Sequence, residues 1–516
     1  MVTKRKASFK ASSAQIQAGG AGRLKKGKIT ACLLVLLCLI SCSSQDEGAF
    51  SGESIASSQP LPAAETDCPE SSTIQSDSIS GTVMDENGVP LPGAIVRVKA
   101  TENETRSGST GSYTLTGLTP GESVFITAWV PGYFIHGVED VLPGSTDVKI
   151  HLHAHHDYDS PDYEWLPSLF HPGEGENQGC SECHSITQSD ENHLSLPVDE
   201  WLLDAHAGSA RNPRFLTMYL GQDVDGNQSP QTRFTTGTDY GQFPLLPDPN
   251  EPYYGPGYKL DFPDTEGNCA ACHTPLPAVD TPYSVDPSQL SGIDLESVSC
   301  DFCHKVWDIT LDPSGLPYAN MPGVLSYEFR RPPEGHQFFA GPLDDVAPGE
   351  DTYSPLQTES QFCAGCHYGV FWDTVVYNSF GEWLESPYSD PETGQTCQDC
   401  HMPPLGRTQF ALTSQGGTVR DASTIYSHRM PGASDVDLLQ NAVTMNVEAE
   451  RDGNSTFVEV SITNDQTGHH VPTDSPLRHL ILLVEVYDAE GSRLQLLEGE
   501  RLPEWCGLGD PEQGYY

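Results

Sequence analysis

Cysteine and histidine recur in one short pattern at five places in the chain. The 516 residues hold 15 cysteines and 18 histidines, and ten of the cysteines form pairs with two residues between them, each pair followed at once by histidine. In chain order, motifs one to five are Cys180-Ser181-Glu182-Cys183-His184, Cys269-Ala270-Ala271-Cys272-His273, Cys300-Asp301-Phe302-Cys303-His304, Cys363-Ala364-Gly365-Cys366-His367 and Cys397-Gln398-Asp399-Cys400-His401. Random placement would give on the order of 0.02 such motifs, so composition alone does not explain the pattern.

The spacing within each motif fits covalent haem attachment. Two cysteines separated by two residues present their thiols on one helical turn, where they match the two vinyl groups of a haem and form two thioethers. The next residue then lies beneath the iron and supplies an imidazole nitrogen. The sequence therefore predicts five c-type haems, held by the ten motif cysteines. The predicted proximal ligands are His184, His273, His304, His367 and His401.

Two other kinds of site use paired cysteines. Structural zinc sites are built from such pairs, but a four-thiolate site has no use for a histidine after every second cysteine, and five motifs pair awkwardly. Disulfides within each motif would give redox sites of the thioredoxin type. Covalent haem is the better interpretation, and it agrees with export, because haem attachment of this kind takes place in the periplasm.

A low-spin haem needs a second axial ligand, and histidines outside the motifs are the candidates. These candidate distal ligands are His193, His206, His336, His428, His469 and His470. His206 lies in a stretch, 201–211, that we expect to be a short helix. Methionine can also serve as a distal ligand and raises the potential, but none of the methionines from Met218 to Met445 has supporting surroundings.

A further group of histidines lies ahead of the first motif. His151, His153 and His155 alternate at strand spacing and so share one predicted face, with His156 beside them. Three interpretations stay open: an exposed polar face, a surface metal site, or a distal ligand for the first haem.

The N-terminus has the features of an export signal, which we assign to residues 1–42. A long basic stretch precedes a mostly apolar run of twelve residues, Ile29 to Ile40, which is short for a membrane span. The run ends in Leu39-Ile40-Ser41-Cys42, which resembles a bacterial lipobox. That resemblance implies a lipid anchor on Cys42, whereas the alternative is an ordinary cleaved signal. Because Ser43 and not Asp follows the cysteine, we expect an outer-membrane lipoprotein facing the periplasm or the cell surface.

Two segments separate the signal from the motifs. Residues 43–76, rich in Ser, Glu, Gln and Pro, are predicted to be a flexible linker. Residues 77–153 alternate short β-rich runs with turn signals such as Asn87-Gly88 and Pro120-Gly121, which predicts a β-sandwich of roughly seven strands. Ser80-Gly-Thr-Val, Asn87 to Ala94 and Gly111-Ser-Tyr-Thr-Leu resemble the carboxypeptidase regulatory-like domain. That resemblance implies a structural or adhesive module without peptidase activity.

The rest of the chain divides into two predicted regions. Residues 154–435 hold all five motifs and are expected to be mostly helix and coil packed around haems. Residues 436–516 are predicted to be a β-rich C-terminal domain, because Ala442 to Ile462 and Leu477 to Tyr487 alternate apolar and polar residues. The last residues show no closing pattern, so we expect this domain to be incomplete. Cys68 and Cys506 stay unassigned.

Composition limits the partners. The formal net charge is −46, which excludes binding to the phosphate backbone of nucleic acid, favours solubility, and suits docking to basic proteins. Apolar content is only 37%, with 48 glycines and 41 prolines. Such a chain is rich in loops, and its interior is expected to be filled partly by something other than side chains.

Residues from about 155 to 516 resemble bacterial multihaem c-type cytochromes of the group related to tetrahaem cytochromes and hydroxylamine oxidoreductases. Beside the motifs, the resemblance is carried by Asp157 to Trp165, the stretch holding His206, Arg330 to Phe339, Glu382 to Tyr388, and Cys397 to Pro403. It implies haems in near contact, between which electrons hop. Motifs two and three are separated by 26 residues (274–299), and motifs four and five by 29 (368–396), which predicts two close pairs.

Three functions follow, and electron transfer is favoured. In that interpretation the five haems pass electrons, in the cell envelope or at its surface, to redox partner proteins or an extracellular acceptor. The alternative is an oxidoreductase acting on a nitrogen or sulfur oxyanion at one open haem beside Lys305, Arg330 and Arg331. Ammonia-forming nitrite reductases of the family carry Lys in place of one motif histidine, and this chain has no such motif. The third is a self-associating extracellular polymer.

Overall fold

The structure, a computed structural model, describes most of the chain after residue 75. The described residues are 31–32, 76–172, 179–186, 195–237, 241–245, 248, 250–347, 349–371, 373–452, 455–475, 478, 480, 482, 485–487 and 490–492. They fall into two compact units. Cys42, Cys68, His193 and Cys506 lie outside the described residues, so the lipid anchor and one distal candidate stay predictions.

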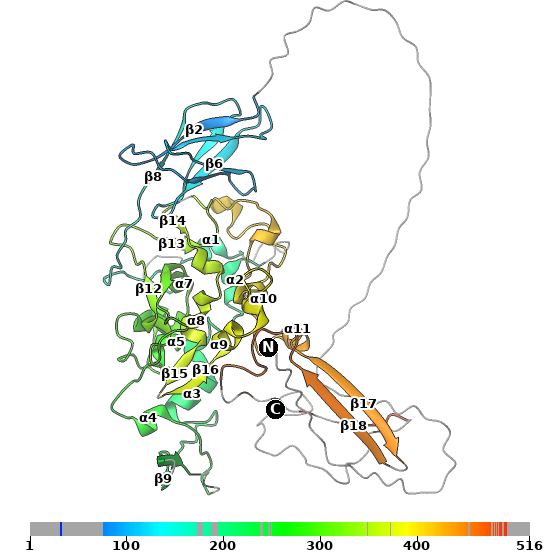
Figure 1. The fold of residues 1–516 in the computed structure, drawn as a ribbon. Helices are drawn as coiled ribbons and strands as arrows, with labels where there is room; N and C mark the ends of the chain where they lie inside the picture. The colour runs from blue at the N-terminus through cyan, green and yellow to red at the C-terminus, as the bar shows by residue number, and fades with distance from the viewer. Residues whose placement is uncertain are drawn as a thin grey trace, which may run out of the picture. The chain divides into compact units, whose positions relative to one another are not determined.

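The larger unit consists of Gln75–Leu438 with Thr467–Arg478, and it begins with the sandwich-like region (blue to cyan in Figure 1). Its strands are β2 (Ile79–Asp85), β3 (Ile95–Val98), β4 (Glu104–Arg106), β5 (Ser112–Leu115), β6 (Val124–Trp129), β7 (His136–Val141) and β8 (Val148–Leu152). One sheet has the order β5-β2-β8, with β2 and β8 parallel, and the other has the order β4-β3-β6-β7. Seven short strands were predicted here and seven are found.

The two sheets enclose a single apolar core. Ile79, Val83, Val96, Ile126 and Ile150 are completely buried between them. Their alternation with polar residues along each strand is the pattern that made this region predictable. The strands β4 and β7 are mostly polar, and no alternation in the residues indicated them.

In the remainder of the larger unit, every motif forms one short helix. These helices are α1 (Ser181–His184), α5 (Ala270–His273), α7 (Cys300–Lys305), α8 (Gln361–His367) and α10 (Cys397–His401). Four of them end at the motif histidine and α7 ends one residue later. Two starts are capped by side chains: the hydroxyl of Ser299 accepts from Phe302 N at 3.2 Å, and that of Thr396 from Asp399 N at 3.2 Å.

Short helices and small sheets connect the motif helices. The helices are α2 (Pro197–Trp201), α3 (Pro213–Leu220), α4 (Tyr258–Asp261), α6 (Pro275–Ala278), α9 (Ser379–Leu384) and α11 (Val436–Gln440), with 3₁₀ turns η1 (Ser209–Arg211), η2 (Gly292–Glu296), η3 (Gly323–Leu325), η4 (Pro355–Thr358), η5 (Pro387–Ser389), η6 (Thr413–Gln415) and η7 (Ala422–Thr424). The strands are β9 (Phe234–Gly237), β10 (Gly241–Pro244), β11 (Val306–Ile309), β12 (Tyr327–Phe329), β13 (Phe339–Gly341), β14 (Asp351–Tyr353), β15 (Gly369–Phe371) and β16 (Thr374–Tyr377). The region is thus a mixture of helix and strand, with more strand than we expected.

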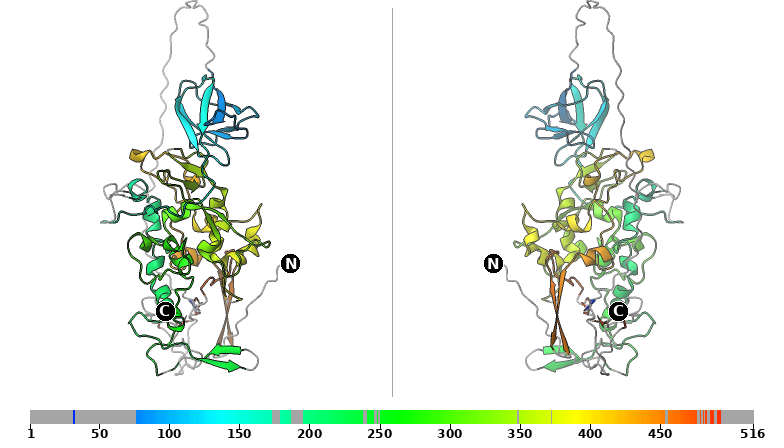
Figure 2. Two further views of the ribbon diagram at one scale, coloured as in Figure 1. Left: turned by 90° about the vertical axis from the view of Figure 1, so that its left-hand side faces the viewer. Right: turned by 90° about the vertical axis from the view of Figure 1, so that its right-hand side faces the viewer.

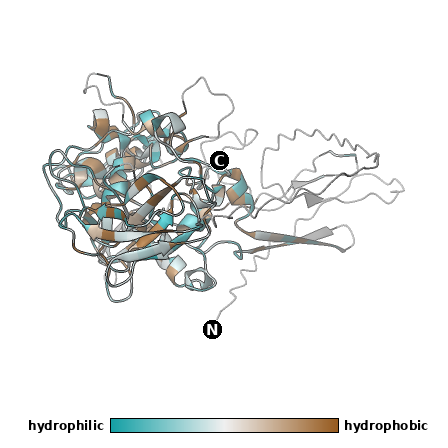
Figure 3. Ribbon diagram, turned by 90° about the horizontal axis from the view of Figure 1, so that it is seen from above, coloured by the Kyte–Doolittle hydropathy of each residue, from teal (hydrophilic) through white to brown (hydrophobic). Residues whose placement is uncertain are grey.

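Among the described residues of this region, no long amphipathic helix organises the fold. Its buried apolar cluster gathers small contributions from many short elements, among them Ala270 and Leu276 near motif two, Phe302 of motif three, Ala364 of motif four and Phe380. Apolar and polar stretches are accordingly interspersed over the ribbon (Figure 3).

We predicted one short helix over residues 201–211, around His206, and this prediction is wrong. Helix α2 ends at Trp201, and His206 lies in the turns before η1. The reason is local: the carboxylate of Asp204 accepts a hydrogen bond from His206 N at 2.7 Å. Such Asx turns compete with the helical backbone hydrogen bonds.

The sandwich lies next to the motif region (Figure 2), and side chains of the two regions pack together in a seam. Trp129 Nε1 donates to Thr352 Oγ1 at 3.1 Å, and Ile135 N donates to Asp351 O at 2.8 Å, both on β14. Ile95, Trp129 and Ile135 are buried there against Tyr353 and its neighbours. Because β14 pairs with β13, the sandwich and the motif region meet through this small parallel sheet.

The smaller unit consists of Met1–Ile74, Leu439–Gln466 and His479–Tyr516. Its main described element is the hairpin of β17 (Thr444–Asp452) and β18 (Ser455–Thr463), in which Thr444 pairs with Thr463. The alternation in Ala442 to Ile462 predicted this β structure. A second pair joins β1 (Ala31–Cys32) to β19 (Glu485–Val486). Among the described residues, no helix has the length and apolar character that crossing a membrane requires.

Gly111 provides a test of the sandwich. Its φ is +71°, and a Cβ there would lie 2.3 Å from the carbonyl oxygen of Val83 in β2. We expect Gly111→Ala to lower the free energy of unfolding by about 1–3 kcal/mol, because backbone strain and a clash combine. Gly117 is the matched control, since its φ is +76° with nothing within 4 Å. Denaturant unfolding followed by circular dichroism should show the larger loss for Gly111→Ala; equal losses would contradict the clash.

Candidate functional site

The fold brings all five motifs into one connected cluster of thiols. Cys180 of motif one lies next to Cys300 of motif three, Cys272 of motif two next to Cys366 of motif four, and Cys363 of motif four next to Cys397 of motif five. Cys303 of motif three lies close to Cys366. Motif four is therefore the centre, with motifs two, three and five around it and motif one beyond motif three.

This arrangement differs in part from the pairs predicted from spacing. The thiols of motifs four and five do meet. The thiol contact of motif two is with motif four, and those of motif three are with motifs one and four. A short connection limits how far apart two motifs can lie. It does not determine which other motif packs against either of them.

The imidazoles of the five motifs share one hydrogen-bond pattern. In each, Nδ1 contacts an oxygen atom supplied by another part of the chain. The contacts are His184 to Phe410 O at 2.7 Å, His304 to Ala340 O at 2.7 Å, His401 to Pro431 O at 2.7 Å, His367 to Asp474 Oδ2 at 3.0 Å, and His273 to Ser209 Oγ at 3.4 Å. A carbonyl oxygen can only accept, so in three of the rings Nδ1 carries the proton. Their Nε2 atoms then carry the lone pair that binds a metal.

Burial keeps most of these rings neutral. It lowers the pKa of His184, His304 and His401, and lowers that of His273 to about 4. For His367 burial acts in the same direction, but the carboxylate of Asp474 outweighs it and raises the pKa to about 9. A carboxylate on Nδ1 is also the partner that makes a metal-bound imidazole more basic.

Two of the distal candidates face motif histidines. The rings of His206 and His367 have centroids 6.1 Å apart, and those of His469 and His401 are 6.2 Å apart. Two imidazoles on opposite sides of one metal, with metal–nitrogen bonds of about 2.0 Å, have centroids roughly 6 Å apart. His206 Nδ1 is held by the Asp204 carboxylate at 2.6 Å, and His469 Nδ1 by the carbonyl of His470 at 2.9 Å.

A third candidate, His428, lies between motifs one and three. The nearby rings of His304 and His184 both contribute to its environment, and burial is the main cause that lowers its pKa to about 3. Its Nδ1 is buried without a hydrogen-bond partner among the described residues. The buried carboxylate of Glu200 positions this residue by accepting from His428 N at 2.7 Å.

The other candidates are placed differently. His336 is 60% exposed and pairs with Glu350 at 2.8 Å, while His470 is 77% exposed and pairs with Glu382 at 2.9 Å. Among the described residues, the ring of neither histidine contacts the ring of a motif histidine. Their assignment as ligands therefore stays a prediction.

The histidines before motif one separate into two groups. Strand β8 ends at Leu152, and only His151 and His153 are exposed at its end. The side chain of His155 packs instead against Phe134, Trp307 and Phe338, so the shared face that we expected does not extend to it. The Nε2 atoms of His155 and His156 are buried and lack hydrogen-bond partners among the described residues.

Motif three is secured by the chain just before motif one. The buried carboxylate of Asp301, between the two cysteines of motif three, accepts from Tyr163 OH at 2.8 Å and Leu166 N at 2.9 Å. It also forms a fully buried ion pair with Lys305. The stretch from Asp157 to Trp165, singled out in the sequence, is thus the segment that closes over this motif.

Two of the three cations considered for an oxyanion site are engaged by carboxylates. Lys305 pairs with Asp301, and Arg331 bonds Asp159 at 2.6 Å and Asp280 at 2.6 Å. Arg330 lies over the ring of Trp307, at 5.6 Å from its centroid, with a buried Nη1 that has no hydrogen-bond partner among the described residues.

Several residues that shape the site were missed in the sequence. Asp474 and Glu200 hold the ring or backbone of a histidine, and Phe410, Ala340 and Pro431 accept from motif imidazoles. The one available signal was a carboxylate close to a candidate ligand, as Asp474 is to His469. Backbone acceptors cannot be recognised from residue types, because every residue carries a carbonyl oxygen.

Comparison with known proteins identifies one part of the chain. The family model of the carboxypeptidase regulatory-like domain matches residues 78–152, and this part of the chain is such a domain. No curated protein matches the chain.

Among solved structures, the chain is similar to a penta-haem cytochrome c552 from Thermochromatium tepidum, at 18% identity and a TM-score of 0.38, over 61% of this chain and 72% of that one. It is also similar to a type II cohesin–X-dockerin complex from Acetivibrio cellulolyticus, at 15% identity and a TM-score of 0.14, over 15% of this chain and 58% of that one. Likenesses of this size carry no argument about the present chain.

The buried pair in motif three gives a stability prediction. Lys305→Met leaves the Asp301 carboxylate buried without its cation, so we expect the free energy of unfolding to fall by about 3–5 kcal/mol. Lys149→Met is the control, because Lys149 and Asp147 are 53% and 76% exposed and 3.9 Å apart; its loss should stay within about 1 kcal/mol. Guanidinium unfolding of both variants measures the difference, and a small loss for Lys305→Met would show that the pair is dispensable.

Proposed function

We propose that the chain is a multihaem c-type cytochrome that passes electrons through five covalently attached haems. The observation that carries this proposal is the repeated geometry of the motifs. Five pairs of thiols form one cluster, and each following imidazole has its Nδ1 turned to an oxygen atom. A proximal ligand needs this arrangement, because it leaves Nε2 for the iron.

In this proposal the haem supplies the one-electron redox chemistry. The chain supplies attachment, orientation and a dry environment. The ten cysteines fix the five groups, the Nδ1 contacts hold the imidazoles at one rotation, and the segments around Tyr163 and Phe410 close two of the motifs from solvent. The connected thiols support short steps between neighbouring motifs, with motif four as the branching point.

Two pairs of rings support six-coordinate irons. The 6.1 Å separation of His206 from His367 and the 6.2 Å separation of His469 from His401 suit axial ligands of motifs four and five. A six-coordinate iron has no open position for a substrate. These pairs therefore favour electron transfer over substrate turnover at those two motifs.

The cations near motif three support the same choice. An oxyanion site needs positive side chains that are not already neutralised. Lys305 is held in a fully buried ion pair, and Arg331 is held by Asp159 and Asp280, which are 32% and 49% exposed. Of the three candidate cations, only Arg330 has no carboxylate partner among the described residues. The role of Lys305 and Arg331 in this structure is to bind the segment 157–166 and the loop carrying Asp280. We therefore propose an electron carrier and do not propose an oxyanion reductase.

The first experiment counts covalent haems. Intact mass after denaturation should equal the processed polypeptide plus five haems, and the alkaline pyridine spectrum should be that of c-type haem. A variant with Cys300→Ala and Cys303→Ala should carry four. Iron analysis complements both measurements, since one iron per motif is expected.

The wild-type protein alone can contradict the proposal, so the result does not depend on how well the variant folds. A polypeptide mass without haem, or zinc in place of iron, would exclude a multihaem cytochrome.

The axial assignment gives a separate prediction. His206→Ala should convert one of the five irons from low-spin to high-spin, because motif four loses the ring opposite His367. Low-temperature electron paramagnetic resonance, with spins quantified against total haem iron, measures this change. His136→Ala is the matched control and should leave all signals unchanged, because His136 is an exposed residue of β7 in the sandwich. Identical spectra for both variants would reject His206 as a ligand.

A further inference from the structure

Two buried arginines keep unpaired N–H groups beside motif one. The side chains of Arg407 and Arg420 are only 3% and 4% exposed. Even so, three of their N–H groups are buried without hydrogen-bond partners among the residues that the structure describes: Nε of Arg407, and Nε and Nη2 of Arg420. A guanidinium is always charged, and burying its donors unpaired is unfavourable unless an anion or water accepts from them.

The segment that carries both arginines folds over motif one. Leu412 N donates to Cys183 O at 2.8 Å, and His184 Nδ1 donates to Phe410 O at 2.7 Å. Phe410 also stacks on the ring of His184, with an interplanar angle of 10°. The guanidinium of Arg420 lies 5.6 Å from the centroid of Phe410. The charge of Arg407 contributes to lowering the pKa of His184, which places Arg407 near the same imidazole.

Each arginine is fixed by a carboxylate on one side only. Arg420 Nη1 donates to both oxygens of Asp345, at 3.0 and 3.2 Å, and Arg407 Nη1 pairs with Glu200 at 2.7 Å. Arg407 also donates to Tyr426 O through Nη2. The carboxylates hold the planes of the two guanidinium groups. Arg407 Nη1 also donates to Ser195 O at 3.3 Å, so Nε of Arg407 and the Nε–Nη2 edge of Arg420 are left for a further acceptor.

We propose that Arg407 and Arg420 bind the two propionate carboxylates of the haem attached to Cys180 and Cys183. This inference rests on the proposed function, because it names the groups that receive one of the five haems. Arginine N–H groups match a carboxylate in shape and charge. The two arginines come from the segment that also supplies the acceptor for His184, so one piece of chain would hold the ligand ring and the polar edge of the same haem.

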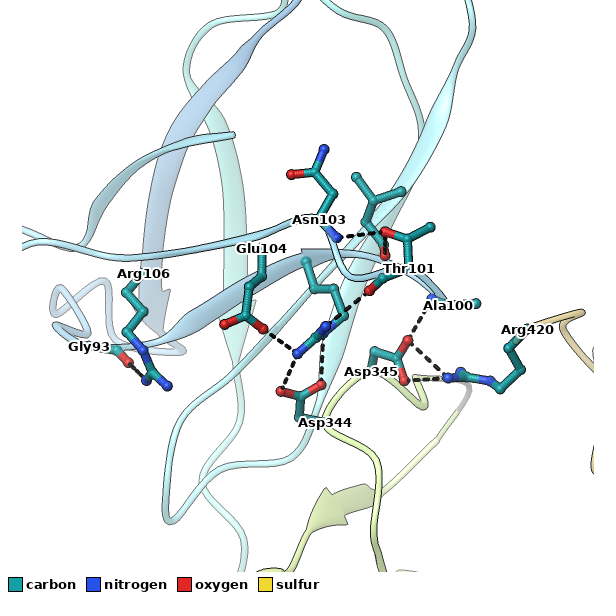
Figure 4. Close-up of polar contacts among 11 residues, drawn as sticks. Gly93, Ala100, Thr101, Asn103, Glu104, Arg106, Asp344, Asp345 and Arg420 are labelled. Carbon is teal, nitrogen blue, oxygen red and sulfur yellow. Dashed lines mark hydrogen bonds and ion pairs between the residues drawn. The ribbon is translucent and has the colours of Figure 1, made fainter. Parts of the chain in front are cut away.

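The sandwich takes part in positioning Arg420. Asp345 Oδ2 accepts a hydrogen bond from Ala100 N at 2.6 Å while the same carboxylate binds Arg420, as Figure 4 shows. The neighbouring Asp344 is fixed by Arg97 of β3 at 3.0 Å. The carboxylate that orients Arg420 is therefore hydrogen-bonded to the carboxypeptidase regulatory-like domain, and this contact connects that domain to the surroundings of motif one.

The experiment uses the full-length, haem-loaded protein and the variant Arg420→Gln. A positive charge close to a haem favours the reduced state. Removing it should leave five haems by mass and shift the reduction equilibrium of one haem at least tenfold toward the oxidised form, about 59 mV for a one-electron couple. Redox titration followed by absorbance and electron paramagnetic resonance measures the potentials. Arg420→Lys should recover part of the shift.

Arg106→Gln is the matched control. It removes the same charge from β4, where the Arg106 side chain is exposed and, within the described part of the chain, bonds only the carbonyl of Gly93, at 3.3 Å. It should leave every potential unchanged. If Arg420→Gln protein is not recovered, Arg407→Gln gives the same test at the second arginine.

Three outcomes would overturn the inference while leaving the proposed function intact. In the first, five haems are present and neither arginine variant shifts any potential. In the second, Arg106→Gln gives the same shift as Arg420→Gln, which would indicate a general effect of net charge. In the third, added inorganic phosphate changes the wild-type potentials and the variants abolish this dependence, which would assign the N–H groups to a diffusible anion. A wild-type protein without haem would instead remove the proposed function itself.

Discussion

The motif region depends on hydrogen bonds from imidazole Nδ1 atoms to oxygens far away in the chain. His184 reaches Phe410, 226 residues later, and His367 reaches Asp474, 107 residues later. Each bond fixes the rotation of a ring and brings a loop against its motif. The loops in turn carry further groups: the segment with Phe410 brings two arginines, and the segment with Asp474 brings His469. Helices of four to seven residues are too short to be stable alone, so these loops and their polar contacts hold the motifs in place.

The polar side chains of this unit serve the same purpose. Asp301 joins motif three to the segment around Tyr163, and Glu200 joins Arg407 to the backbone of His428. Both carboxylates are buried, and each has several donors, which is the condition under which burying a charge is tolerated. In an ordinary domain apolar helices would perform this role. Here the apolar content is only 37%, so hydrogen bonds, together with whatever the motifs bind, hold the segments together.

A feature could be predicted from the sequence when a few consecutive residues contain its whole signal. The motifs and the sandwich were visible because five consecutive residues, or a strand with its turn, contain the whole signal. The strands β4 and β7 were not visible because they bury few apolar groups. His206 stays a candidate ligand, but the helix predicted around it is wrong, because the Asp204 carboxylate accepts from the backbone N–H of His206. The acceptors Ala340 and Pro431 are backbone atoms of unremarkable residues, so only the folded chain identifies them. The seam was equally hidden, since Trp129 and Ile135 look like any core residues until β14 covers them.

The direction of the long hydrogen bonds has a consequence for how the protein is made. For His184, His304, His367 and His401, the acceptor lies after the motif in the chain. If the chain is exported from its N-terminus, as we propose, these motifs would emerge before the loops that close over them. During that interval the thiols and imidazoles would be accessible for haem attachment, and the later segments would then complete the fold around a group already in place. In this proposal attachment precedes closure, and no folded intermediate would have to reopen.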